Sequence, residues 1–223
     1  MGDIAISLAN LDLAHVLISL VVLLFSLSIH ESAHAWTADR LGDPTGRHLG
    51  RVSLNPLVHI DPIGTVVFPL IAAITGVPLI GWAKPVPVNP ANLKNPRRDH
   101  VYIAAAGPGV NLIAGCVFLV LLRVILATYG QVAISSAGII TPVFKLLLQG
   151  VFVNFLLAIF NLIPIPPLDG SWILSGLLPL RLSNAYNRLR PYGGILLLVL
   201  VYTRALNVVF QPLVDTLEIL IQI

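Results

Sequence analysis

Two histidines and a glutamate stand within five residues, in His30-Glu31-Ser32-Ala33-His34. On a helix, positions four apart share a face, so both imidazoles can reach one metal ion. Glu31 lies next to the first histidine and can contact a metal-bound water without binding the metal itself. The run ends an apolar stretch, where unpartnered ionisable side chains are costly. The pattern predicts a metal site; the alternative is a pair of histidines at a polar contact between helices.

A catalytic zinc site usually has three protein ligands, so a third ligand is needed. Only Asp169 lies in a setting suited to that role, at the end of Asn161-Leu162-Ile163-Pro164-Ile165-Pro166-Pro167-Leu168-Asp169-Gly170. Three prolines in four residues end a helix, and Gly170 allows a tight turn after the carboxylate. The alternative is a proline-rich exit loop with an exposed aspartate. The other candidates are carboxylates and spare imidazoles: Asp12, Asp39, Asp43, Asp61, Asp99, Asp215, His15, His48, His59 and His100.

The elements that must position these residues are membrane helices. Of the 223 residues, 57% are hydrophobic and only 10% are charged. An average soluble domain has about 25% charged residues, so lipid must be the solvent for most of the chain. This composition excludes a soluble enzyme, a disordered regulator and a disulfide-stapled secreted module, and the single cysteine, Cys116, cannot form an intramolecular disulfide.

Four apolar stretches are long enough to cross a bilayer as helices: 13–36, 101–128, 139–163, and 194–210 with an apolar tail. A fifth stretch, 64–80, is shorter and is interrupted by prolines and a glycine, which favours a re-entrant hairpin or paired short helices. We therefore expect an all-α polytopic membrane protein with about four full transmembrane helices and a re-entrant segment. We expect one membrane-embedded domain over residues 1–223, with its catalytic core over about 11–170.

Residues 81–90 carry proline at alternate positions, which forbids helix and predicts a short extended edge strand. Such a strand beside the metal could pair with an unwound substrate; a plain cytoplasmic linker is the alternative. His59 and Asp61 could line the same entrance, although turn chemistry before Pro62 explains Asp61 equally well.

Basic residues predict the orientation of the chain in the cell membrane. Because lysine and arginine accumulate in cytoplasmic loops, the two segments that hold most of them should be cytoplasmic. The metal site would then lie toward the cytoplasmic side, since His30 precedes Trp36 by about 9 Å of helical rise. A short interfacial helix is expected over 180–190. The basic residues of the two segments are Arg40, Arg47, Arg51, Lys84, Lys94, Arg97 and Arg98, then Arg181, Arg188 and Arg190.

Together, HESAH late in one apolar stretch and NLIPIPPLDG after a later one resemble the site-2 protease family of intramembrane zinc metalloproteases. A third motif, Gly107-Pro108-Gly109-Val110-Asn111, resembles the family's Gly-x-x-x-Asn element. The resemblance implies one Zn²⁺ per chain, held by His30, His34 and Asp169, with Glu31 as the general base. It also implies transmembrane protein substrates. This chain departs from larger relatives of the family because its 223 residues leave no room for a PDZ or CBS domain, so a minimal form is expected.

Asn111 has two interpretations. Its amide could donate a hydrogen bond to the oxyanion that develops during peptide hydrolysis. It could equally make a hydrogen bond between helices beside a close contact at Gly107.

The predicted function is hydrolysis of peptide bonds in or near transmembrane segments of membrane proteins. The alternative is a catalytically silent membrane protein that binds or transports a metal, which would need ligands but no general base at Glu31. No phosphate-binding glycine loop and no basic-aromatic surface for nucleic acid is found in the sequence. The sequence does not indicate an oligomeric state.

Overall fold

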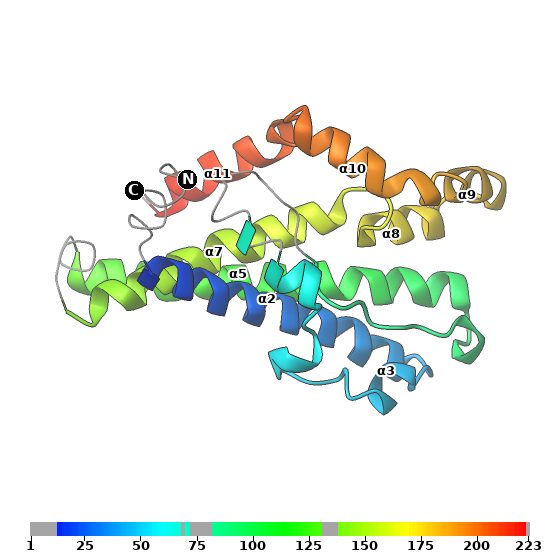
Figure 1. Cartoon of the computed structure of the whole chain (residues 1–223), viewed down its shortest axis with the longest axis horizontal. Helices are drawn as coiled ribbons and strands as arrows, with labels where there is room; N and C mark the ends of the chain where they lie inside the picture. The colour runs from blue at the N-terminus through cyan, green and yellow to red at the C-terminus, as the bar shows by residue number, and fades with distance from the viewer. Residues whose placement is uncertain (1–12, 68–69, 72–81, 131–137, 222–223) are drawn as a thin grey trace.

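Three long helices form the centre of the protein in the computed structural model, which describes residues 13–67, 70–71, 82–130 and 138–221. They are α2 (Leu13–Arg40), α5 (Pro96–Tyr129) and α7 (Ile140–Leu162). Figure 1 shows them running along the longest axis of the molecule, and α5 packs against both α2 and α7. Each is long and apolar enough to cross a membrane. These helices confirm the all-α membrane architecture that the sequence predicts.

Close approach of α5 and α7 depends on two glycines that face aromatic rings. A Cβ atom at Gly115 would lie 2.9 Å from the ring of Phe155, and one at Gly150 would lie 2.7 Å from the ring of Phe118. Small residues let membrane helices pack closely where no hydrophobic effect draws them together. The pair is extended by a buried apolar cluster that includes the C-terminal helix: Leu122, Phe144, Leu147, Val151, Leu217 and Ile221.

The proline-rich segment ends α7 and positions the next helix, α8 (Asp169–Leu177). Proline cannot continue the helical hydrogen-bond ladder, so α7 stops at Leu162, before the prolines. At Gly170 a Cβ atom would lie 2.2 Å from the carbonyl oxygen of Leu162. The absence of a side chain at this position therefore allows the start of α8 to pack against the end of α7.

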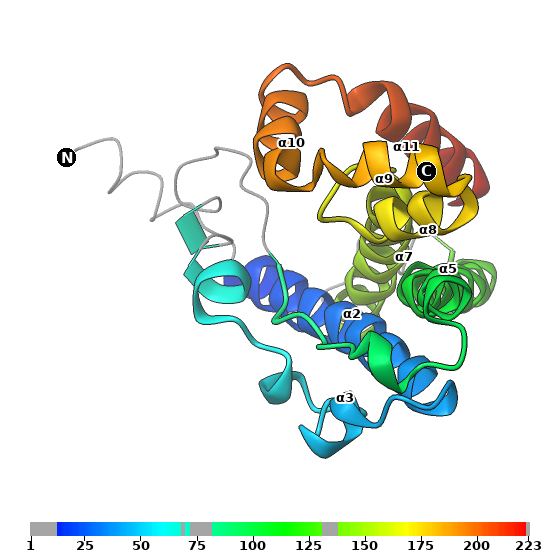
Figure 2. The same cartoon turned by 90° about the vertical axis from the view of Figure 1, so that its right-hand side faces the viewer.

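The predicted fourth span is broken in the structure. The helix expected over 180–190 is present as α9 (Leu180–Asn187), followed by α10 (Gly193–Tyr202) and α11 (Asn207–Ile221). The segments Leu180–Tyr202 and Asn207–Ile221 meet at an angle of 60°. They are long and apolar enough to cross a membrane only as a pair. Arg204 has a positive φ of 56°, which ends α10 within the expected stretch. Figure 2 shows α8, α9, α10 and α11 on one side of the central helices.

The loop between α2 and α5 contains α3 (Thr45–His48), a π-helical turn over Pro62–Val67 and single 3-10 turns over Pro56–Val58 and Pro90–Asn92. The predicted re-entrant segment extends into residues 72–81, which lie outside the described residues. The expected edge strand has no partner strand in the part of the chain that the structure describes. Residues 82–89 instead donate backbone hydrogen bonds to scattered acceptors, because the prolines leave too few N–H groups for a regular ladder.

Asp43, a fully buried residue, anchors this loop at the end of α2. Its carboxylate accepts hydrogen bonds from the backbone N–H of Asn89 at 2.6 Å, the side chain of Asn92 at 2.8 Å and the hydroxyl of Thr45 at 2.5 Å. Burial alone would raise the pKa of Asp43, but these hydrogen bonds outweigh it and hold the pKa below its usual range. Asp43 thereby links the end of α2 to the segment that leads into α5.

Candidate metal centre

The two histidines of HESAH lie on one face of α2, as their spacing predicts. Both side chains are buried, and their rings lie edge to face with centroids 4.7 Å apart. The Nε2 atom of His34 lies 3.1 Å from the Nε2 atom of His30. The two nitrogen atoms therefore point at the same small volume.

Asp169, the predicted third ligand, joins them from the first residue of α8. Its Oδ2 atom lies 3.1 Å from His30 Nε2 and 3.2 Å from His34 Nε2. A helix N-terminus favours negative charge, so α8 stabilises the carboxylate at this place. These three residues form a metal-binding group whose possible ligand atoms all lie within 4.8 Å of one another.

Hydrogen bonds from α5 fix which nitrogen of each imidazole is free. His34 Nδ1 lies 2.7 Å from the carbonyl oxygen of Ile103, which can only accept, so Nδ1 carries the hydrogen. His30 Nδ1 lies 2.5 Å from the side-chain oxygen of Asn111, which also accepts. In the neutral imidazoles both Nε2 atoms therefore present lone pairs.

The geometry fits a zinc ion. With both histidines neutral, two nitrogen lone pairs and a carboxylate oxygen lie 3.1 to 3.2 Å apart with no hydrogen between them. Such a group is repulsive unless a cation lies among its members. Ligands about 2.0–2.1 Å from a tetrahedral zinc lie about 3.3 Å from one another, close to the separations found here.

Gly107 keeps this volume open from the side of α5. A Cβ atom at position 107 would lie 2.4 Å from His34 Nε2 and 2.6 Å from His30 Nε2. Gly107 stands four residues after Ile103 and four before Asn111, so one stripe of α5 supports both imidazoles. Any side chain at this position would enter the space that the ligand atoms share.

Glu31 lies with the three ligand candidates on the wall of a cavity of about 790 Å³. Its Oε2 atom accepts a hydrogen bond of 3.2 Å from the backbone N–H of Val86, in the segment that precedes α5. Ala83, Pro85 and Val86 line the same cavity, whose walls are mostly apolar. The carboxylate is thus held beside the metal group, and the extended segment forms one side of the site.

Asn111 is fully buried, and it does not line this cavity. One amide hydrogen points to the carbonyl oxygen of Ser26 at 3.2 Å and the other to the side-chain oxygen of Asn154 at 2.8 Å. Both donors of the amide are used between helices, and its oxygen accepts from His30. The contacts therefore favour the interpretation of Asn111 as an inter-helix hydrogen-bonding residue.

Sequence reasoning gave no role to Asn161 and Trp172, which line the cavity, and it named His100 only among the spare imidazoles considered as a third ligand. Asn161 opens the proline-rich motif, which was the available signal for it. His100 lies on α5 seven residues before Gly107, a spacing of about two helical turns. His59 and Asp61 are not among the lining residues: His59 bonds to the carbonyl oxygen of Ser53 at 2.8 Å, and Asp61 accepts from the N–H of Gly64 at 2.8 Å.

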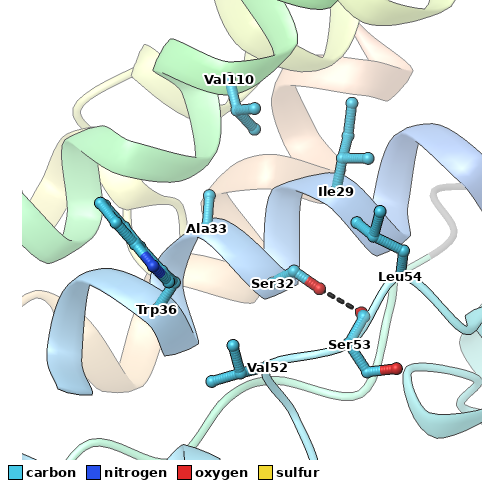
Figure 3. Close-up of a pocket in the computed structure, with 8 residues that line it drawn as sticks. All are labelled: Ile29, Ser32, Ala33, Trp36, Val52, Ser53, Leu54 and Val110. Atoms are coloured by element: carbon cyan, nitrogen blue, oxygen red, sulfur yellow. Dashed lines mark hydrogen bonds between the residues drawn. The ribbon is translucent and has the colours of Figure 1, made fainter. Parts of the chain in front are cut away.

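A second hollow of about 400 Å³ lies between α2, Val110 of α5 and residues 52–54 (Figure 3). Its lining includes Ile29, Ala33 and Trp36, positions that differ in phase from His30 and His34 on the helix. The one hydroxyl that α2 contributes, that of Ser32, already donates to the carbonyl oxygen of Ser53 (Figure 3). None of the described residues that line this hollow is titratable, so the metal group and its cavity are the candidate active site.

Comparison with known proteins agrees with this geometry. The sequence pattern described as Peptidase family M50 matches residues 18–201, which is most of the chain. The chain belongs to peptidase family M50. This membership confirms the resemblance to site-2 proteases, and with it a zinc metalloprotease. A catalytically silent metal-binding protein is not favoured.

Two relatives illustrate the similarity. The chain is 37% identical over 197 residues to the "Putative zinc metalloprotease YwhC" of Bacillus subtilis (strain 168), covering 87% of this chain and 84% of that one. It is 30% identical over 192 residues to the "Putative zinc metalloprotease Rip2" of Mycolicibacterium smegmatis, covering 86% of this chain and 69% of that one. No solved structure gives a significant match to this M50 protease.

Proposed function

We propose that this M50 protease hydrolyses peptide bonds in or near transmembrane segments of other membrane proteins, with one Zn²⁺ held by His30, His34 and Asp169. The observation that carries the proposal is the convergence of three ligand atoms at 3.1 to 3.2 Å beside Glu31. Bound zinc supplies a Lewis acid that polarises the scissile carbonyl and makes water acidic enough to react near neutral pH.

Glu31 acts as the general base. A carboxylate next to the metal ligands can take a proton from the attacking water and then deliver it to the leaving amine. The hydrogen bond from Val86 restricts the rotation of the Glu31 side chain and holds it on the cavity wall. Asn111 does not contact the metal itself. It accepts the Nδ1 hydrogen of the ligand His30 and so keeps the Nε2 atom of His30 available for the metal.

The active site lies toward the cytoplasmic side of the cell membrane. Trp36, half of whose surface is exposed, lies close to the end of α2 with the guanidinium of Arg40 5.1 Å from its ring centre. Tryptophan and arginine gather at the membrane interface, and basic loops stay in the cytoplasm. His30 is then about 9 Å of helical rise below this level, within reach of a membrane-embedded substrate.

The extended segment before α5 binds the unwound substrate. Alternate residues of this segment turn their N–H groups to the protein: Trp82 donates to Gly64 at 3.2 Å, and Lys84 donates to His59 at 2.9 Å. Ala83 and Pro85 line the cavity, where their carbonyl oxygens would accept hydrogen bonds from substrate N–H groups. The alternative is a linker without a role in binding. Replacing residues 85–87 by Gly-Ser-Gly should raise KM for a transmembrane substrate; an unchanged KM would favour the linker.

The whole chain forms one membrane-embedded catalytic domain, and purified protein tests its function directly. We expect one zinc per chain by elemental analysis, and cleavage of a defined transmembrane substrate that stops with a chelator and returns with zinc. His34→Ala should lose both the zinc and the activity. His48→Ala, which removes an exposed imidazole from α3, is the matched control and should lose neither. Wild-type protein without zinc would contradict the proposal.

A further inference from the structure

Three fully buried polar side chains connect the three central helices next to the metal group. They are Ser26 on α2, Asn111 on α5 and Asn154 on α7, each with none of its surface exposed. Buried polar groups within a membrane protein are costly unless each is satisfied, so a continuous chain of them marks a functional feature. Asn154 lies at the far end of this chain, and it does not line the cavity.

The orientation of the Asn154 amide is fixed by the two groups that its nitrogen contacts, the carbonyl oxygen of Gly150 and the hydroxyl of Ser26. Its nitrogen donates to the carbonyl oxygen of Gly150 at 2.8 Å and to the hydroxyl oxygen of Ser26 at 2.9 Å. Because a carbonyl oxygen cannot donate, the side-chain oxygen of Asn154 must face the other way, toward Asn111. It accepts the Asn111 amide hydrogen at 2.8 Å.

The hydrogen bonds of Asn111 in turn determine the tautomer of the metal ligand His30. With its nitrogen bonded to Asn154 and to the Ser26 carbonyl, Asn111 can present only its oxygen to His30. His30 must then carry its hydrogen on Nδ1, which leaves a lone pair on Nε2 at the metal group. If the Asn111 amide turned by 180°, its nitrogen would face His30 and favour the tautomer with hydrogen on Nε2, in which Nε2 has no lone pair for the metal.

We propose that Asn154 is a positioning residue for zinc binding, which acts through Asn111 to hold His30 in its metal-binding tautomer. The proposal rests on the zinc site of the proposed function. With Asn154 in place, turning the Asn111 amide breaks the two hydrogen bonds that the amide donates; without Asn154, it breaks only the one to the Ser26 carbonyl. In both cases the hydrogen bond with His30 re-forms with the other tautomer of the imidazole. Loss of outer partners of metal ligands typically weakens metal binding 10- to 100-fold, and Asn154 stands one bond further out.

The test is zinc affinity of the full-length protein in detergent, measured by competition with a chromogenic chelator. Asn154→Leu fills a similar volume but offers no acceptor to Asn111, and we expect zinc to bind about tenfold more weakly. Asn154→Asp keeps an acceptor for Asn111 and should bind zinc more tightly than Asn154→Leu. A role in packing alone predicts the reverse order, because leucine suits a buried site better than a carboxyl, and that order would overturn the proposal.

A double-mutant cycle separates the relay from general destabilisation. If Asn154 acts through Asn111, then adding Asn154→Leu to Asn111→Leu should not weaken zinc binding further, whereas additive losses would refute the relay. Val151→Ala, a buried apolar change one turn earlier on α7, should lower thermal stability with unchanged zinc affinity. Wild-type protein that binds no zinc would refute the proposed function, whereas equal zinc affinity of wild type and Asn154→Leu would refute this inference alone.

Discussion

Replacing Gly107 by alanine is a small change with a large expected effect on the metal site. The added methyl group would lie 2.4 Å from His34 Nε2 and 2.6 Å from His30 Nε2, whereas real Cβ contacts essentially never fall below 3.0 Å. The His34 nitrogen would have to move by about 0.6 Å, beyond the roughly 0.2 Å tolerance of a metal–ligand distance. Neither ring is free to move, since Ile103 and Asn111 hold their Nδ1 atoms.

We therefore expect Gly107→Ala to weaken zinc binding by about 100-fold, or about 2.8 kcal/mol. Overpacking of this kind should also lower the free energy of unfolding by about 1–3 kcal/mol. Chelator competition measures the first effect, and thermal unfolding in detergent measures the second. Cleavage of a transmembrane substrate should fall with zinc occupancy and recover in part with excess zinc.

Gly109→Ala is the matched control, because it makes the same change on the same helix. A Cβ atom at Gly109 meets nothing within 4 Å, so zinc affinity should stay at the wild-type value. Wild-type zinc affinity in Gly107→Ala would show that α5 does not approach the imidazoles as closely as described. The same weakening in both variants would show that the effect comes from the helix backbone rather than from the metal site.

Other predictions concern positions outside α5. Gly170→Ala should weaken zinc binding by displacing Asp169. The added methyl group would lie 2.2 Å from the backbone oxygen of Leu162, which no side-chain rotation can move away. Zinc affinity in the wild-type range would contradict this prediction. Asp43→Asn should lower the free energy of unfolding by about 2 kcal/mol at pH 7, through weaker hydrogen bonds at the end of α2. Because the pKa of Asp43 is lowered in the folded state, its contribution is present above the unfolded pKa of about 3.9 and is lost as the pH falls further. Thermal unfolding from pH 7 to pH 3 should therefore show a smaller loss in Asp43→Asn than in wild type, and parallel curves would refute this role.

The parts of the site that local spacing determines could be predicted from the sequence. His30 and His34 share a face because any helix brings positions four apart together. The end of α7 could also be predicted, since proline at 164 and 166 cannot continue a helix, whatever surrounds it. The apolar stretches that became α2, α5 and α7 follow from the requirement that a helix satisfies all backbone groups in lipid.

Features that depend on packing could not be predicted in the same way. His30 and Asp169 stand 139 positions apart, so their contact is a result of how α8 packs against the central helices. The pairing of Asn111 with His30 requires the rotation of α5 relative to α2, which hydropathy does not encode. The break at Arg204 escaped prediction because mean hydropathy stays high across it while one residue adopts a left-handed conformation.

The most direct test of the central claim compares zinc content and proteolysis in Glu31→Gln. Glutamine keeps the size of the side chain, and it can still accept the hydrogen bond from Val86, but it cannot take a proton from water. We expect one zinc per chain, as in wild type, and cleavage of a transmembrane substrate at a rate at least 100-fold below the wild-type rate, because general-base catalysis is lost. Cleavage at the wild-type rate with zinc bound would contradict the assignment of Glu31 and, with it, the proposed mechanism.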